Sequence, residues 1–255
     1  MANLSVTRSA FIESKLFNRY GIRGIFTTRS GGISPAPFDS QNFGSGLGDP
    51  DANIEHNLHR LLDSSDIPGP PHQAIQTHQI ATLWCNGPGY MHSTEADILL
   101  SSQHNTPLAI RTADCLPILL ADPATGITAA VHAGWRGTAS NVVQHAVQAM
   151  LNRGASSAHI LASLGPCIGS CCFNIGADVA TALKNSVIGA ESFVNDHADL
   201  RQINRLQILD SGLSEGNIEC INACTACDKA QFFSFRRDAG VTGRHIAVVA
   251  IASKP

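Results

Sequence analysis

The chain has 255 residues, of which 44% are hydrophobic and 15% are charged, and its net charge is −3. This composition supplies a sizeable core and excludes wholesale disorder, and it carries no basic footprint for nucleic acid. The N-terminus lacks the apolar segment of a secretory signal, and no run of about 18 apolar residues marks a membrane span. We expect a cytoplasmic monomer that binds neither nucleic acid nor a membrane.

In chain order, residues 23–32 predict a strand that runs into a glycine turn, and residues 34–51 predict a long loop. Asp51 is placed to cap a helix over 52–63. Four apolar segments follow and predict strands: "ADILLS", "PLAIRT", "LPILLAD" and "GITAAVHAG". The last two are joined by the short turn "DPATG", which favours antiparallel pairing between them.

The second half alternates helices and strands. An apolar stripe predicts a helix over 138–152 that Gly154 ends, and residues 176–185 and 199–213 also favour helices. The remaining strand segments are "HILASLG", "NIECI", "AQFFSF" and "RHIAVVAIA". Interleaved helices and strands with at least one hairpin predict an α/β or α+β fold with mixed sheets. No shift in composition divides the chain, so we expect residues 1–255 to form one domain.

Three residues are the first candidates for chemistry: His78 in "IQTHQ", Cys115 in "TADC" and His132 in "VHAGW". Cys115 and His132 lie near the outer ends of the two strands expected to form the hairpin, so their side chains can meet. One thiolate and two imidazoles form a coherent ligand set for zinc or copper. Three protein ligands leave one tetrahedral position open, where bound water would have a pKa of about 7 and become hydroxide.

The same residues allow two other interpretations. Cys115 can be a buried strand cysteine and His132 a hydrogen-bonded turn histidine, with no chemistry. Alternatively, the two can form a metal-free pair in which the imidazole activates the thiol as a nucleophile.

Polar residues beside the three candidates invite further roles. Asp114 can orient an imidazole, contact a substrate hydroxyl or simply cap a strand end. Arg136 can hold an anion such as phosphate, or form a structural ion pair, and Arg29 in "TTRSGG" invites the same two interpretations. Trp135 can stack on a planar base, although an indole at a strand end is more often part of the core.

Eight cysteines in a chain without an export signal are more typically buried, metal-binding or catalytic than paired in disulfides. In "GPCIGSCC", Cys167, Cys171 and Cys172 can be ligands, but small buried packing residues are the simpler expectation. "CINACTAC" places cysteines at 220, 224 and 227 in the C-x3-C-x2-C spacing of radical iron–sulfur enzymes, yet too late in the chain for such a fold. A structural zinc there needs a fourth ligand, and the sequence shows none nearby. His56 and His59 lie at i, i+3 and are expected to face solvent.

The motifs together resemble the YfiH-like family, also called the laccase-domain or multicopper polyphenol oxidase family. The matching segments occur in family order from about residue 23 to 246: "TTRSGGIS", "QNFGSGLGDPDANIEHN", "QTH", "ADILLS", "TADCLPILLAD", "VHAGWRGT", "GPCIGSCCF", "INRLQIL", "CTAC" and "FFSFRRDAGVTGRH". The pair "TADCLPILLAD" and "VHAGWRG" is the most specific.

The resemblance implies layered mixed sheets flanked by helices and a metal site at His78, Cys115 and His132, with zinc expected and copper possible. It also implies phosphorolysis of adenosine, inosine, guanosine and methylthioadenosine, together with adenosine deamination. The substrates would be purine nucleosides and phosphate. Of the polar residues considered above, Arg136 and Arg29 would hold the phosphate, and Asp114 would contact the substrate. Relatives have been linked to peptidoglycan precursor composition as well.

The chain departs from the family pattern at Gln79 in place of glycine, at Leu58 in place of arginine, and at Phe173-Asn174 in place of Tyr-Glu. These changes bear on substrate range more than on the three metal ligands. Three other functions remain open: a copper-dependent polyphenol oxidase, a metal-free Cys–His hydrolase linked to peptidoglycan precursor editing, and a protein that binds such a precursor without turnover. A multicopper centre needs many clustered imidazoles, and no H-x-H pair is present.

Overall fold

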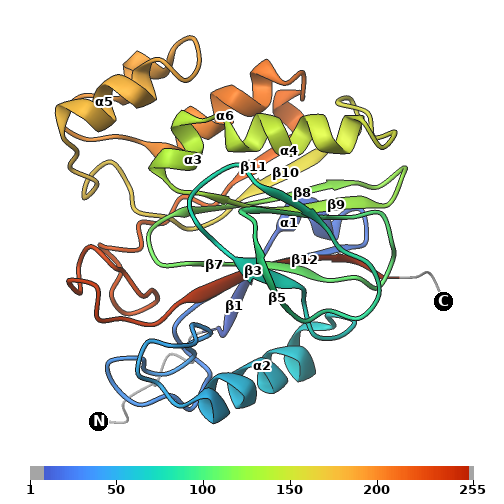
Figure 1. Cartoon of the computed structure of the whole chain (residues 1–255), viewed down its shortest axis with the longest axis vertical. Helices are drawn as coiled ribbons and strands as arrows, with labels where there is room; N and C mark the ends of the chain where they lie inside the picture. The colour runs from blue at the N-terminus through green and yellow to red at the C-terminus, as the bar shows by residue number, and fades with distance from the viewer. Residues whose placement is uncertain (1–8, 253–255) are drawn as a thin grey trace, which may run out of the picture.

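Two β-sheets lie face to face between two layers of helices in the computed structural model, which describes residues 9–252 (Figure 1). The six-stranded sheet has the order β11 (Ile218–Cys220), β10 (Leu161–Leu164), β8 (Leu116–Asp122), β9 (Ile127–Ala133), β6 (Ile98–Ser101) and β4 (Thr82–Trp84). The four-stranded sheet has the order β1 (Phe11–Glu13), β2 (Ile22–Thr27), β12 (His245–Ile251) and β7 (Leu108–Thr112). Parallel and antiparallel pairs occur together, so the predicted mixed α/β architecture is confirmed.

Helices cover the outer face of each sheet (Figure 1). The six-stranded sheet is covered by α3 (Trp135–Ala139), α4 (Val142–Leu151) and α6 (Leu200–Asp210), with α5 (Ala177–Lys184) packed against α3. The four-stranded sheet is covered by α2 (Asp51–Ser65). Short elements complete the chain: α1 (Lys15–Asn18), the 3₁₀ turns Ala190–Phe193 and Glu215–Asn217, and a small parallel pair of β3 (Gln73–Ile75) and β5 (Met91–Glu95).

The core consists of three apolar layers that follow from the alternation of side chains along each strand. On β8, Ile118 and Leu120 pack toward the helices, whereas Leu119 packs toward the four-stranded sheet. Every residue of β8 and β9 is buried, which explains why these strands read as continuous apolar runs. A third cluster joins β12 to Leu61 of α2.

The hairpin of β8 and β9 sets up the site. The two strands pair antiparallel as predicted, with Pro117 opposite His132 and Leu116 opposite Ala133. Cys115 directly precedes β8, so it lies beside the end of β9 that carries His132.

Three expected elements differ from the sequence prediction. The helix over 138–152 is split into α3 and α4, because Asn141 adopts the left-handed conformation with φ 58°. Asp51 is the first helical residue rather than the cap, and Pro50 precedes it. The segment "AQFFSF" is not a strand, since its backbone donates to side chains instead: Phe233 N to His245 Nε2, 2.8 Å away, and the following Arg236 N to Asp114, 2.7 Å away.

Among residues 9–252, no helix combines the length and the apolar composition that crossing a membrane requires.

Candidate active site

The structure brings His78, Cys115 and His132 together. One ligand atom from each of the three side chains lies within 4.8 Å of the others. Cys115 Sγ lies 3.8 Å from His78 Nε2, and the two imidazole rings meet edge to face with centroids 4.7 Å apart. His132 is buried, whereas Cys115 and His78 are partly accessible, so the cluster opens toward solvent on one side.

Asp97 anchors both histidines although the sequence analysis did not single it out. It is fully buried, and His132 Nδ1 lies 2.6 Å from its Oδ1. The same carboxylate accepts backbone N–H bonds from Thr77, His78 and Gln79 at 2.9–3.0 Å, which fixes the loop that carries His78. Burial opposes ionisation of Asp97, but the hydrogen bonds from His132 and from this loop outweigh it and lower the pKa of the carboxyl group.

An ionised Asp97 can only accept hydrogen bonds, so His132 donates through Nδ1–H. Its Nε2 is therefore the nitrogen left for Cys115 or for a metal ion. A histidine whose second nitrogen donates to a carboxylate is the usual arrangement at metal sites. The one feature of the sequence that could have indicated Asp97 is its position as an acidic residue at the start of the apolar run "DILLS".

Cys115 and His132 also form an electrostatic pair in the metal-free protein. Burial raises the pKa of the Cys115 thiol, but the positive charge of His132 and hydrogen bonds from both histidines overcome burial and lower the pKa to about 6. Burial likewise opposes charge on His132, yet Cys115 and Asp97 together raise its pKa to about 9. The thiol is thus a thiolate at neutral pH, which is the form that binds metals and acts as a nucleophile.

These residues fit a metal ion by their donor chemistry. A thiolate and two imidazoles suit zinc or copper, and three protein ligands leave a position for a substrate or water. Gly134 lies against the cluster, where an added Cβ would stand 2.9 Å from the His78 ring and 3.1 Å from Cys115 Sγ. The absence of a side chain there gives the ligands the space they occupy.

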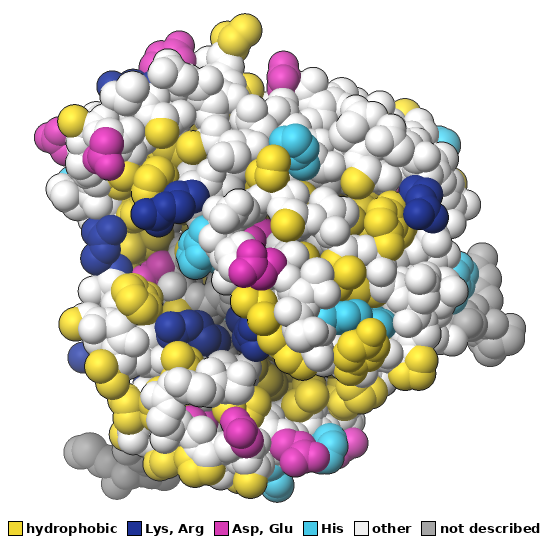
Figure 2. Space-filling model, viewed as in Figure 1, with side chains coloured by type: hydrophobic (Ala, Val, Ile, Leu, Met, Phe, Trp, Pro, Cys, Tyr) yellow, Lys and Arg dark blue, Asp and Glu magenta, His cyan; other side chains and the backbone are white. Residues whose placement is uncertain are grey.

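A cavity of about 500 Å³ opens over the three residues. Its walls include three arginines, Arg111, Arg236 and Arg244, and apolar side chains such as Phe173 and Phe235. Figure 2 shows basic side chains gathered around a hollow on this face of the molecule. Burial lowers the pKa of Arg111 and of Arg244, and the positive charge of Arg244 lowers that of Arg111 further. An anion placed among these guanidinium groups would relieve their repulsion.

Sequence reasoning missed all three arginines. The sequence offers one clue to Arg111, which is a charged residue within the otherwise apolar strand β7. Arg244 directly precedes β12 and has no such clue. Thr112 of β7 pairs with His245 of β12, so the two arginines converge only through this long-range pairing. Arg236 donates from Nη1 to the Asn174 carbonyl, 3.0 Å away, so one of the departures from the family pattern lies beside the pocket.

Asp114 lines the cavity, but its carboxylate is already engaged. It accepts hydrogen bonds from the Thr225 hydroxyl at 2.6 Å, from the Ser234 hydroxyl at 3.0 Å and from Arg236 N at 2.7 Å. The residue therefore ties the loop over 225–236 to the start of β8, beside Cys115.

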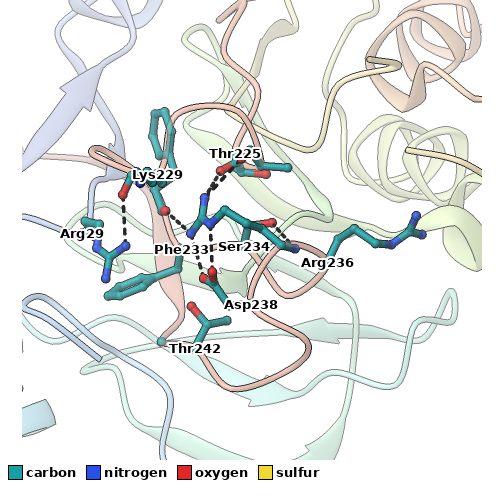
Figure 3. Close-up of polar contacts among 12 residues, drawn as sticks. Arg29, Thr225, Lys229, Phe233, Ser234, Arg236, Asp238 and Thr242 are labelled. Carbon is teal, nitrogen blue, oxygen red and sulfur yellow. Dashed lines mark hydrogen bonds and ion pairs between the residues drawn. The ribbon is translucent and has the colours of Figure 1, made fainter. Parts of the chain in front are cut away.

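Arg29, Trp135 and Arg136 are not brought to the cavity. Arg29 donates hydrogen bonds to Asp39 and to the Lys229 carbonyl. Figure 3 shows Arg29 far from Arg236, the arginine of this region that lines the cavity, and the Arg236 side chain points away from Arg29. Arg136 stacks over the Trp135 ring, 4.3 Å from its centroid, because both belong to α3. Trp135 packs against the main core cluster, as its simpler interpretation predicted.

The remaining cysteines and histidines divide by burial. Cys167 is buried, as expected, and lies 3.3 Å from Nη2 of Arg201. Cys171 is exposed and Cys172 partly exposed, so the expectation that both are buried packing residues is wrong. His56 and His59 on α2 face solvent as predicted. Two of the departures from the family pattern lie in different places. Gln79 is exposed next to His78, whereas Leu58 on α2 packs against the four-stranded sheet.

Fold and site together define an α/β protein with a His–Cys–His cluster able to hold a metal in an arginine-lined pocket. The family described as multi-copper polyphenol oxidoreductase laccase matches residues 23–252, and the chain belongs to this family. It is 35% identical over 230 residues to a purine nucleoside phosphorylase of Deinococcus radiodurans, covering 89% of this chain and 88% of that protein. It is 34% identical over 227 residues to purine nucleoside phosphorylase YfiH of Escherichia coli, covering 88% and 91%. The crystal structure of YlmD from Geobacillus stearothermophilus superposes with a TM-score of 0.85 at 28% identity, covering 96% of this chain and 97% of that one.

Proposed function

We propose that the chain is a purine nucleoside phosphorylase that cleaves adenosine, inosine, guanosine and methylthioadenosine. The observation that carries the proposal is the cavity of about 500 Å³ in which the His78–Cys115–His132 cluster faces three arginines. A nucleoside needs an apolar wall for its base, and phosphate needs cationic donors. This cavity offers both, and relatives of the chain carry the name of this activity.

In phosphorolysis, a phosphate oxygen forms a bond to the ribose C1′ while the C1′–N9 bond breaks. The purine leaves with the electron pair of that bond and takes up a proton, so the products are the base and ribose 1-phosphate, or 5-methylthioribose 1-phosphate when methylthioadenosine is cleaved. We assign phosphate binding to Arg111, Arg236 and Arg244 in place of Arg29 and Arg136. The rings of Phe173 and Phe235 are the surfaces on which the planar base can pack.

His78, Cys115 and His132 would hold the metal, and zinc is the ion we assign because the set combines one thiolate with two imidazoles. When bound, the ion supplies Lewis-acid polarisation of a substrate oxygen or of water. Asp97 keeps His132 Nδ1 protonated and holds His78 in place. Adenosine deamination is a second reaction of the same site, in which water adds at the purine C6 and ammonia leaves.

The charge state of Cys115 favours one alternative, a metal-free hydrolase that uses Cys115 as nucleophile and His132 as its acid–base partner. Copper at the same three ligands would instead support phenol oxidation. Metal analysis of protein purified without added metal separates the hydrolase from the metal enzyme. Oxidation of a phenol under air tests the copper enzyme.

The substrate range is tested by incubating zinc-loaded protein with each of the four nucleosides and phosphate. Chromatography should show the free base in all four reactions, and inosine should form from adenosine when phosphate is omitted. If no nucleoside is cleaved by zinc-loaded protein, the proposed phosphorylase activity is wrong. Inosine without any free base would leave a deaminase in its place.

A further inference from the structure

A second group of sulfur ligands lies outside the candidate active site. Cys171 and Cys172 belong to the turn that follows β10, and Cys224 and Cys227 belong to the loop that follows β11. The two loops run side by side, because Cys167 and Cys224 are parallel bridge partners and Thr225 N donates to the Cys167 carbonyl at 3.0 Å. The sequence grouped Cys224 and Cys227 with Cys220 and showed no fourth ligand nearby, whereas the fold leaves Cys220 outside the group and brings Cys171 and Cys172 to it instead.

The four sulfur atoms lie at coordination spacing. Cys227 Sγ lies 3.5 Å from Cys171 Sγ and 3.3 Å from Cys172 Sγ, and all four sulfurs lie within 4.8 Å of one another. Zinc binds thiolate sulfur at about 2.3 Å, so tetrahedral geometry places sulfur atoms about 3.8 Å apart. The two shortest contacts are slightly below that value, no pair exceeds 4.8 Å, and all four cysteines are free thiols in the structure.

The backbone around the cluster is shaped to receive thiolates. Gly169 N donates to Cys224 Sγ at 3.2 Å, and such N–H bonds to sulfur stabilise the negative charge of a ligand. An added Cβ at Gly169 would lie 3.2 Å from Cys171 Sγ and 3.5 Å from Cys224 Sγ, so glycine permits this close approach. Arg237 donates to the carbonyls of Thr225 and Ala226, the two residues between Cys224 and Cys227.

We propose that Cys171, Cys172, Cys224 and Cys227 bind one structural zinc ion. Four protein ligands close the tetrahedron and leave no position for substrate, which distinguishes this site from the His78–Cys115–His132 cluster. Binding converts each cysteine thiol to a thiolate and releases the proton to solvent. The zinc stays divalent, so no oxidant or reductant takes part.

The ion would hold two loops together beside the pocket. The Thr225 hydroxyl, between two of the ligands, donates to Asp114 at 2.6 Å, and Ile168 N donates to the Asp114 carbonyl at 2.9 Å (Figure 3 shows Thr225 within its network). Asp114 directly precedes Cys115. The zinc site therefore acts as a positioning device for the wall of the active-site cavity, with no contact to substrate.

Metal content tests the proposal by difference. Inductively coupled plasma mass spectrometry measures the zinc bound per chain in the wild type and in the double variant C224S/C227S. The control is C220A, which removes a cysteine outside the four-cysteine group. The double variant should lose one equivalent of zinc, while C220A keeps the wild-type content. C115S should keep the zinc equivalent that the double variant loses, because Cys115 belongs to the His78–Cys115–His132 cluster and not to the four-cysteine site. Equal zinc in the wild type and the double variant would overturn the proposal.

Cobalt spectroscopy of C115A, which keeps all four proposed ligands, covers the case in which the double variant does not fold. Cobalt in a four-thiolate site gives intense sulfur-to-metal charge-transfer absorption and tetrahedral ligand-field bands. We expect one equivalent of cobalt to produce this spectrum, and zinc to displace it. Absence of the spectrum, or a disulfide between Cys227 and either Cys171 or Cys172 in freshly purified protein, would show that the cluster is not a metal site.

Discussion

His132 donates from Nδ1 to the Asp97 carboxylate over 2.6 Å, and this contact directs the other nitrogen of the ring toward Cys115. His132 lies on β9, and Asp97 immediately precedes β6, the strand beside it in the sheet, with Ile98 opposite Val131. The orientation of one candidate ligand is therefore fixed by strand pairing. Because Asp97 also holds the loop of His78, one buried carboxylate positions two of the three ligands.

Replacing Asp97 with asparagine should weaken metal binding. The amide carries no charge and cannot match all the hydrogen bonds that the carboxylate accepts, so His78 and His132 lose orientation. Loss of such a partner typically lowers metal affinity by about 10–100-fold. Competition with a chromogenic chelator measures the change, and Glu95→Gln, an exposed carboxylate just before the site, is the matched control. Unchanged affinity in Asp97→Asn would show that the carboxylate does not support a metal ligand.

The Cys115 thiol should react as an acid of low pKa in metal-free protein. Its pKa of about 6 lies below the ordinary value of 9.0, so the thiolate forms as pH rises through about 6, and it is paired with a charged His132 up to about pH 9. Alkylation of Cys115 by iodoacetamide, followed by peptide mass spectrometry after chelation, should reach most of its plateau by pH 7. His132→Ala removes the positive charge, and burial then raises the pKa, so the rate at pH 7 should fall. A wild-type rate that rises only near pH 9 would contradict the thiolate–imidazolium pair.

Arg244→Gln should raise the KM for phosphate. A hydrogen bond to a charged group contributes about 1.5–3 kcal/mol, which corresponds to roughly a 10–100-fold change in affinity. Initial rates at varied phosphate and saturating nucleoside measure the effect. Arg136→Gln is the control, because Arg136 stacks on Trp135 outside the cavity. A larger effect from Arg136→Gln than from Arg244→Gln would return phosphate to the site that the sequence first suggested.

Gly134→Ala should disturb the ligand cluster without breaking the backbone. Gly134 has φ −72°, which alanine adopts freely, but the new methyl group would press on the His78 ring and on Cys115 Sγ. Overpacking of this kind costs about 1–3 kcal/mol, and we expect weaker metal binding with a modest fall in melting temperature. Gly216→Ala, where an added Cβ meets nothing within 4 Å, should leave both unchanged. Wild-type metal affinity in Gly134→Ala would mean that the cluster is looser than its distances indicate.

The sequence predicted what local pattern and short turns control. The turn "DPATG" between two apolar runs gave the β8–β9 hairpin, and the hairpin brings Cys115 beside His132. Arg136 was misplaced because nearness in sequence to His132 suggested nearness to the site, whereas α3 carries it away from the cavity. Asp97, Arg111 and Arg244 reach the site through pairings between strands distant in sequence, and local patterns do not reveal which strands pair.

The most direct test of the account measures free base and ribose 1-phosphate from adenosine in the same zinc-loaded reaction, with and without phosphate. The account predicts that wild-type protein forms ribose 1-phosphate in an amount equal to the total free base, adenine plus the hypoxanthine that follows deamination, and only when phosphate is present. It predicts that Cys115→Ala forms neither free base nor ribose 1-phosphate. Adenine release that does not depend on phosphate, or full activity in Cys115→Ala, would contradict it.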